Sequence, residues 1–166
     1  MDMYIFWGLP GAGKTTLARR WSAEIGALLI DSDALALPFT DLEPDHRKLF
    51  SRTFAVLENM LRNNPQYTGP IVFTDSLSNP KNVKSLLEIG QTTSAEMKFL
   101  KVVCSPETAF NRIQSRREKQ VVKNTFAELC EMETTLSSYG FSSKEIPNRK
   151  TASIYQNLEL IREFYA

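Results

Sequence analysis

The residues with the clearest chemical meaning form one short run near the amino terminus. The run matches the spacing G-x4-G-K-[ST] of a phosphate-binding loop, or P-loop. Its glycines let the backbone curl so that successive N–H groups face an anion, and a helix starting directly after it adds its positive end. The run predicts a site for a nucleoside triphosphate, with ATP favoured. Its residues are Gly8, Leu9, Pro10, Gly11, Ala12, Gly13, Lys14, Thr15 and Thr16.

Within this run, Lys14 has the length to reach the outer phosphates, and the Thr15 hydroxyl is a typical Mg²⁺ ligand. We expect every residue of the run except Leu9 to contact the nucleotide. We also expect a contact from Arg116, which lies much further along the chain. The predicted cofactors are therefore ATP and Mg²⁺.

Two aspartates follow predicted strands and supply the other half of a transfer site. Asp33 follows the apolar run 27–30, where a carboxylate can take a proton from an attacking hydroxyl. The alternative for Asp33 is a helix cap or turn residue, and Asp31 is the weaker candidate for the base. Asp75 follows the apolar run 71–73, a pattern typical of a carboxylate that holds Mg²⁺ through water. The next residue is Ser76 rather than a water-polarising glutamate, which favours a kinase over a motor ATPase.

Three arginines, Arg112, Arg116 and Arg117, lie on a predicted helix after the apolar run 97–104. Arginines on a segment above the phosphates can neutralise charge as a phosphoryl group moves. We assign this catalytic role to Arg117 and expect a lid over about 107–124. The alternative is a solvated basic face, and this alternative is stronger for Arg112.

Short apolar runs alternate with segments of helical periodicity along most of the chain. This alternation predicts an α/β domain with a parallel sheet covered on both faces, and ligands beyond the carboxyl ends of its strands. We expect strands at 3–7, 27–30, 71–75 and 97–104, with a weaker one at 145–146. We expect helices at 14–25, 45–63, 80–89, from 105 onward, at 125–138 and at 152–164.

Length and composition are those of one domain covering all 166 residues. The net charge of +1 does not indicate a nucleic-acid binder by composition alone. Two cysteines and no signal-like amino terminus predict a reduced, cytoplasmic chain. No apolar run reaches the roughly 18 residues of a membrane span.

The chain resembles the P-loop kinases that include phage-type 5′-hydroxyl polynucleotide kinase, zeta toxins and chloramphenicol phosphotransferase. The resemblance is closest to the polynucleotide kinase domain and is carried by the runs 8–16, 30–33, 74–80 and 115–117. It implies an adenylate-kinase-like, five-stranded parallel sheet of order 2-3-1-4-5. It also implies Asp33 as general base, Lys14 and Thr15 on phosphate and Mg²⁺, Arg117 as the lid arginine and Asp75 in support of the metal.

Three functions stay open, and they differ mainly in the phosphoryl acceptor. The resemblance favours the 5′-hydroxyl end of DNA or RNA. A small alcohol, a nucleoside or a hydroxymethylated DNA base is the second acceptor class. It gains weight because the related kinases usually carry Asp-x-x-Arg where this chain has Asp33-Ala-Leu-Ala36. The third reading is a nucleotide-binding ATPase or regulatory module without an acceptor.

Overall fold

The computed structural model describes residues 1–43, 45–115, 124–140, 142–148 and 153–165. In this part of the chain, five strands form one sheet in the order β2-β3-β1-β4-β5, and every pair of neighbours is parallel. The predicted fold class and strand order are therefore confirmed. The strands are β1 (Asp2–Trp7), β2 (Leu28–Asp31), β3 (Ile71–Thr74), β4 (Glu96–Val103) and β5 (Lys144–Pro147).

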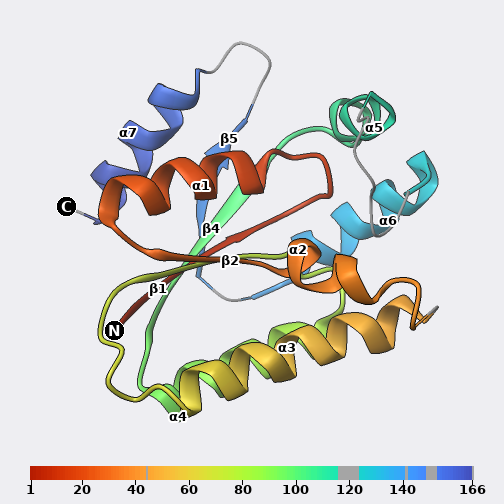
Figure 1. Cartoon of the computed structure of the whole chain (residues 1–166). Helices are drawn as coiled ribbons and strands as arrows, with labels where there is room; N and C mark the ends of the chain where they lie inside the picture. Colours follow the sequence, from red (N-terminus) through yellow and green to blue (C-terminus); the bar gives the residue numbers. More distant parts are fainter. Residues whose placement is uncertain (44, 116–123, 141, 149–152, 166) are drawn as a thin grey trace.

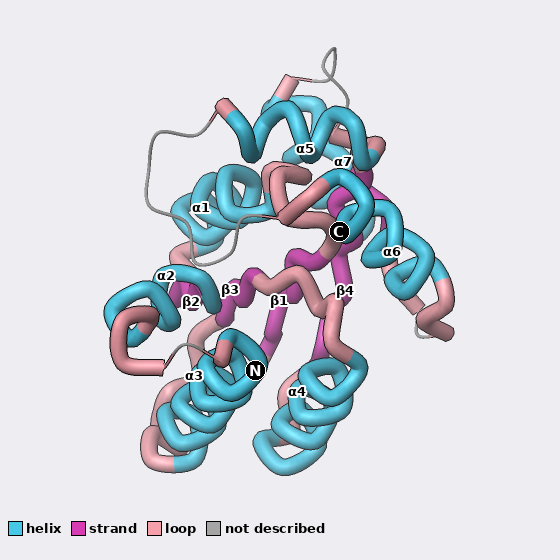
Figure 2. The backbone as a smooth tube through the Cα atoms, turned by 90° about the vertical axis from the view of Figure 1, so that its right-hand side faces the viewer, coloured by secondary structure: helices cyan, strands magenta, loops and turns pink. Residues whose placement is uncertain are grey.

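Helices cover both faces of the sheet (Figure 1). One face carries α1 and α7, and the other carries α3 and α4, as the view along the sheet in Figure 2 also shows. The helices α2, α5 and α6 lie toward the carboxyl ends of the strands (Figure 1). The helices are α1 (Lys14–Ile25), α2 (Ser32–Ala36), the 3₁₀ helix η1 (Leu37–Phe39), α3 (His46–Arg62), α4 (Pro80–Thr93), α5 (Pro106–Gln114), α6 (Phe126–Ser137) and α7 (Ile154–Tyr165).

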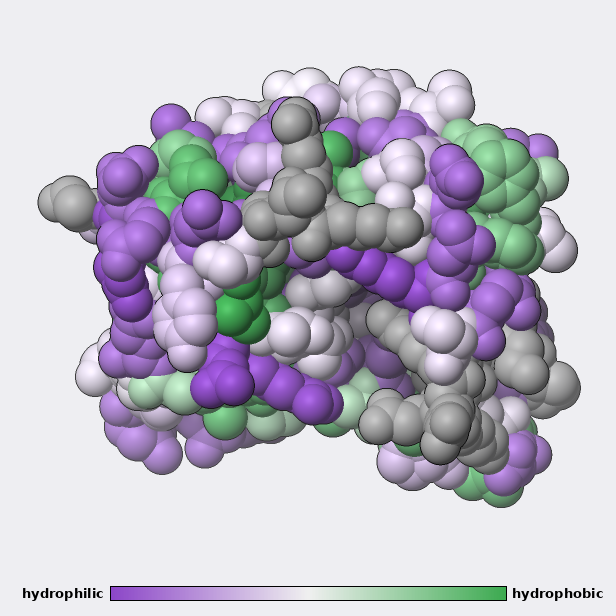
Figure 3. Space-filling view, turned by 90° about the horizontal axis from the view of Figure 1, so that it is seen from above, coloured by the Kyte–Doolittle hydropathy of each residue, from purple (hydrophilic) through white to green (hydrophobic). Residues whose placement is uncertain are grey.

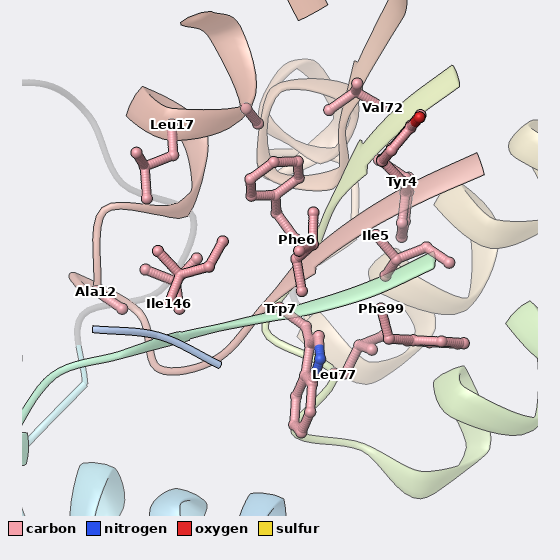
Figure 4. Close-up of a cluster of buried hydrophobic side chains, with 14 of the residues drawn as sticks. Tyr4, Ile5, Phe6, Trp7, Ala12, Leu17, Val72, Leu77, Phe99 and Ile146 are labelled. Atoms are coloured by element: carbon pink, nitrogen blue, oxygen red, sulfur yellow. The ribbon is translucent and has the colours of Figure 1, made fainter. Parts of the chain in front are cut away.

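The central strand β1 delivers the chain to the P-loop through the middle of the core. Met3 to Trp7 are all buried, so the strand contacts apolar side chains on both faces, as expected in a parallel sheet with two helical layers. Successive side chains alternate between the faces, and Phe6 and Trp7 extend to opposite sides of β1 (Figure 4). This packing fixes the position at which the backbone leaves the sheet at Gly8.

Most predicted elements form within a few residues of the expected bounds, and the weakly indicated strand is present as β5. Two regions differ. Residues 32–39 are helical although no helix was expected between the strand at 27–30 and the helix at 45–63; the Asp31 side chain accepts a hydrogen bond from the Asp33 N–H and starts α2. The helix α4 continues past Gly90 to Thr93, so Gly90 does not end it; a Cβ at position 90 would collide with the Met97 side chain, which accounts for the glycine there.

The face on which α1 and α7 lie is mostly hydrophilic, with hydrophobic side chains in separate groups (Figure 3). Among the described residues, every helix is too short or too polar to cross a bilayer.

The first prediction concerns the bend at Gly8, whose φ is +131° and whose added Cβ would lie 2.5 Å from the Val102 carbonyl oxygen. Gly8→Ala should lower the free energy of unfolding by about 2–4 kcal/mol, since it adds a steric clash to an unfavourable backbone conformation. Gly26→Ala is the control, because Gly26 has a φ of +65° but open space around it. Its loss should be about 1 kcal/mol. Urea unfolding measures both, and equal losses would contradict the proposed clash.

Candidate active site

The P-loop joins β1 to α1 and is shaped by glycines with positive φ. Gly11 has a φ of +83°, and Gly13 has a φ of +96° as the N-cap of α1. The Ala12 N–H closes a turn onto the Leu9 carbonyl at 3.0 Å. Gly13 has no side chain, so no capping oxygen at that position competes for the N–H groups of the first turn of α1. The loop is therefore suited to receive an anion at the positive end of the helix.

The Lys14 ammonium lies inside the curl of this loop. Its Nζ donates hydrogen bonds to the carbonyl oxygens of Gly8, at 3.0 Å, and Leu9, at 2.9 Å. These bonds hold the charge next to the backbone that an anion would face. The loop thus combines a full positive charge with the partial charge of a helix terminus.

The outer side of the loop is held by two side chains from distant parts of the sequence. Arg112 of α5 donates to the carbonyl oxygens of Gly11 and Ala12 at 3.4 and 3.3 Å. Asn148, which follows β5, donates from Nδ2 to the Ala12 carbonyl at 2.5 Å. Because these carbonyls are bonded on the outside, the loop can present N–H groups on its inside.

A pocket of about 430 Å³ opens beside the loop, on the side of α5 and β5. Its volume is within the usual range for small-molecule sites. It is lined by Gly11, Gly13, Thr16, Leu17, Arg112, Ser115, Asn148 and Ile154. A larger pocket, of about 950 Å³, lies between the ends of α3 and α4, and none of the predicted site residues lines it.

The acidic run after β2 is arranged differently from the sequence-based expectation. The strand ends at Asp31, and Asp33 is the second residue of α2 rather than the residue that closes the strand. Asp31, the weaker candidate for the base, is the N-cap of α2. The Asp33 side chain is exposed, whereas Ser32 is only 2% exposed.

Asp75 is the buried carboxylate of the site and directly follows β3. It is 4% exposed, and its Oδ1 accepts the Leu77 N–H at 2.6 Å. Burial raises the pKa of Asp75 to about 6, although hydrogen bonds from the Ser32 hydroxyl and Leu77 N–H act in the opposite direction. The charge of Asp33 also raises this pKa, and that of Lys14 lowers it. Asp75 is therefore close enough to both charged groups to sense them.

The donor set suits magnesium. Mg²⁺ prefers oxygen ligands and usually takes only one or two from the protein, with water and phosphate completing the shell. Thr15 offers a half-buried hydroxyl, and Asp75 offers a buried carboxylate whose charged form a cation would stabilise. The described residues contain no cluster of three or more acidic, histidine or cysteine side chains suited to a metal. The described residues could therefore supply one or two ligands to a magnesium ion whose other ligands are water and phosphate.

One edge of the sheet holds the predicted site residues of the loop together with the two aspartates. Of the three predicted arginines, the structure describes only Arg112. The helix α5 ends at Gln114, and Arg116 and Arg117 lie outside the described residues. Arg112, for which a solvated face had more weight than for the other two arginines, contacts the loop instead.

Sequence reasoning missed Asn148 and Ser32. Ser32 stands inside the acidic run and could have been suspected, but nothing in the spacing around Asn148 indicates its contact with the loop.

Solved structures share this fold at low sequence identity. A candidate kinase from Chloroflexus aurantiacus J-10-fl has a TM-score of 0.76 and 14% identity, with 99% of this chain and 98% of that chain covered. A sugar kinase from Janibacter sp. HTCC2649 has a TM-score of 0.70 and 18% identity, with 98% and 93% covered. A deoxyadenosine kinase from M. mycoides, solved with bound dATP, has a TM-score of 0.64 and 13% identity, with 98% of each chain covered. At these identities the likeness establishes the fold.

A family model described as an AAA domain, AAA_33, matches residues 3–139. The match begins in β1 and ends just after α6, so it includes the P-loop, both aspartates and α5. No curated protein matches the chain significantly.

The second prediction uses the pKa of Asp75, raised from 3.8 to about 6. Because folding favours the neutral form, the stability that this group confers is present below pH 4 and is lost as the pH rises through 6. Asp75→Asn removes this titration. Its free energy of unfolding relative to the wild type should rise between pH 4 and 7 by up to about 3 kcal/mol.

Urea unfolding across this pH range, without nucleotide or magnesium, measures the difference. A difference that stays constant with pH would contradict the assignment.

Proposed function

Because the chain belongs to the AAA_33 family of AAA domains, we propose that its P-loop serves a kinase, which transfers the γ-phosphoryl group of ATP to a hydroxyl group. One observation carries the proposal. The P-loop between β1 and α1 holds the Lys14 ammonium against the Gly8 and Leu9 carbonyls, at the edge of the sheet where β2 and β3 end just before Asp33 and Asp75. A phosphate-binding cation, a metal-suited carboxylate and an exposed carboxylate therefore share one edge of the sheet.

In this phosphoryl transfer, the acceptor, the phosphates and the metal are served by different residues. Asp33 takes the proton from the acceptor hydroxyl, whose oxygen forms the new bond to the γ-phosphorus as the bond to the ADP oxygen breaks. Lys14 and the N–H groups at the start of α1 stabilise the charge on the phosphate oxygens. Thr15 and Asp75 would hold Mg²⁺, which neutralises phosphate charge when bound.

The nucleoside of ATP is assigned to the pocket of about 430 Å³ beside the loop. Arg112 and Asn148 line this pocket and already bond to the loop carbonyls. Their polar atoms and the apolar side chains of Leu17 and Ile154 form the mixed lining that small-molecule sites use. Arg116 and Arg117 remain proposed contacts from the lid.

For the acceptor, we favour a small hydroxylated molecule over a polynucleotide end. Polynucleotide kinases of the type that the chain resembles use an arginine three residues after the base to hold the acceptor phosphate. Here that residue is Ala36, which is fully buried. The fold neighbours include a sugar kinase and a deoxyadenosine kinase, which agrees with this acceptor class.

An acceptor screen with γ-labelled ATP and Mg²⁺ tests this function. We expect label transfer to a member of a panel of sugars, polyols and nucleosides. Transfer to 5′-hydroxyl oligonucleotides alone would keep the kinase and overturn the acceptor class. If labelled phosphate is released at the same rate with and without every acceptor, the kinase is overturned and an ATPase is indicated.

The third prediction separates the base from the phosphate-binding residues. Asp33→Asn should lower kcat about 10²- to 10⁴-fold, because a positioned general base contributes that range, and should leave ATP affinity nearly unchanged. Lys14→Ala should lose both ATP binding and transfer. Calorimetry and label transfer measure the two effects.

Glu163→Gln is the matched control, since Glu163 is an exposed carboxylate on α7. Transfer by Asp33→Asn at a rate near that of this control would remove Asp33 from the mechanism.

A further inference from the structure

The turn after β3 contains an unfavourable backbone conformation next to Asp75. Leu77 has a φ of +54°, and its side chain is completely buried. A left-handed conformation costs a residue other than glycine about 1–2 kcal/mol. Such a residue persists where its surroundings hold it, and these residues gather at functional sites.

Hydrogen bonds fix Leu77 through both of its backbone polar groups. Its N–H donates to Asp75 Oδ1 at 2.6 Å, and its carbonyl accepts a hydrogen bond from the Tyr139 hydroxyl at 2.7 Å. The first bond sets the direction of the Asp75 carboxylate. The second holds the residue that supplies the first.

Tyr139 also contacts the strand that leads into the P-loop. Its ring lies against the Trp7 indole, with centroids 6.1 Å apart and planes at 42°. Trp7 is the last residue of β1 and directly precedes Gly8. Trp7 and Leu77 both belong to the buried cluster drawn in Figure 4. Tyr139 therefore contacts both the residue before the P-loop and the turn that holds Asp75.

The helix that carries Tyr139 is itself anchored. Leu129 and Leu136 of α6 are buried in the core. Glu133 of the same helix pairs with the Lys101 ammonium of β4 at 3.5 Å, and that lysine is only 7% exposed. Tyr139, two residues past the end of α6, is thus presented to the turn from a fixed support.

We propose that Tyr139 is a positioning residue, whose hydroxyl holds Leu77 in its left-handed conformation so that the Asp75 carboxylate keeps the orientation needed for magnesium. This inference rests on the proposed role of Asp75 in the kinase. Partners of this kind, one step removed from a metal ligand, typically change metal affinity about 10- to 100-fold when lost.

Tyr139→Phe tests the proposal, because it keeps the ring against Trp7 and removes the hydroxyl. The Mg²⁺ concentration for half-maximal transfer should rise about tenfold. The KM for ATP at saturating Mg²⁺ should change less than about twofold, because phosphate binding is assigned to Lys14 and the start of α1, and phenylalanine keeps the ring against Trp7. In the nucleotide-free protein, hydrogen exchange at the Leu77 amide should accelerate about tenfold, since the loss of one hydrogen bond weakens its protection.

Tyr67→Phe is a closely matched control. It also removes a hydrogen bond from a tyrosine hydroxyl to a backbone carbonyl, that of Pro70 at 2.9 Å, but in the loop between α3 and β3. It should leave both the Mg²⁺ dependence and Leu77 exchange unchanged.

Three outcomes would overturn the positioning role. In the first, Tyr139→Phe keeps the exchange and the Mg²⁺ dependence of the wild type. In the second, Leu77 exchange is faster but the Mg²⁺ dependence is unchanged. In the third, every kinetic constant falls equally. If the wild type transfers no phosphoryl group, the proposed kinase fails on its own. The Mg²⁺ dependence of ATP binding, measured by calorimetry, then supplies the metal comparison in place of transfer.

Discussion

The close approach of the P-loop backbone to β4 and α5 is the constraint on which the rest of the site depends. A Cβ at Gly8 or Gly11 would lie 2.5 Å from the carbonyl oxygen of Val102 or Ala109. The absence of these side chains lets the loop pack against its supports and curl tightly. Lys14 then reaches the Gly8 and Leu9 carbonyls from the first turn of α1. The position of the Lys14 ammonium thus depends on the absence of side chains at Gly8 and Gly11.

The second constraint is electrostatic and lies across the site at Asp75. Burial opposes the charge of this carboxylate, and the nearby Asp33 adds to the opposition. The Ser32 and Leu77 hydrogen bonds and the Lys14 charge offset only part of that cost, since the pKa remains raised. A buried carboxylate whose charged form is disfavoured in this way lowers the stability of the fold, but a bound cation would stabilise that charge. The unfavourable backbone at Leu77 belongs to the same compromise.

Local patterns in the sequence were sufficient for the fold class and most elements, whereas the strand order was expected from the family resemblance. Buried strands such as β1 read as apolar runs ended by glycine, and the P-loop spacing located the start of α1. The helix α2 was missed because its start depends on one hydrogen bond, which the Asp33 N–H donates to the Asp31 side chain. The contacts of Arg112, Asn148 and Tyr139 could not be predicted, since they join residues 62 to 136 positions apart. Such contacts depend on how elements pack, which periodicity does not encode.

The acceptor side of the site can be argued from the shape of α2. Asp31 caps this five-residue helix and sets its direction, which leaves Asp33 exposed and Ala36 in the core. A side chain at position 36 therefore begins inside the protein, and alanine suits that place. Lys14 and Arg112 contact the P-loop itself, on the side assigned to the phosphoryl donor. An acceptor recognised through hydroxyl groups fits this division of charge better than an acceptor recognised through its own phosphate, because the two cations that contact the loop, Lys14 and Arg112, are assigned to ATP.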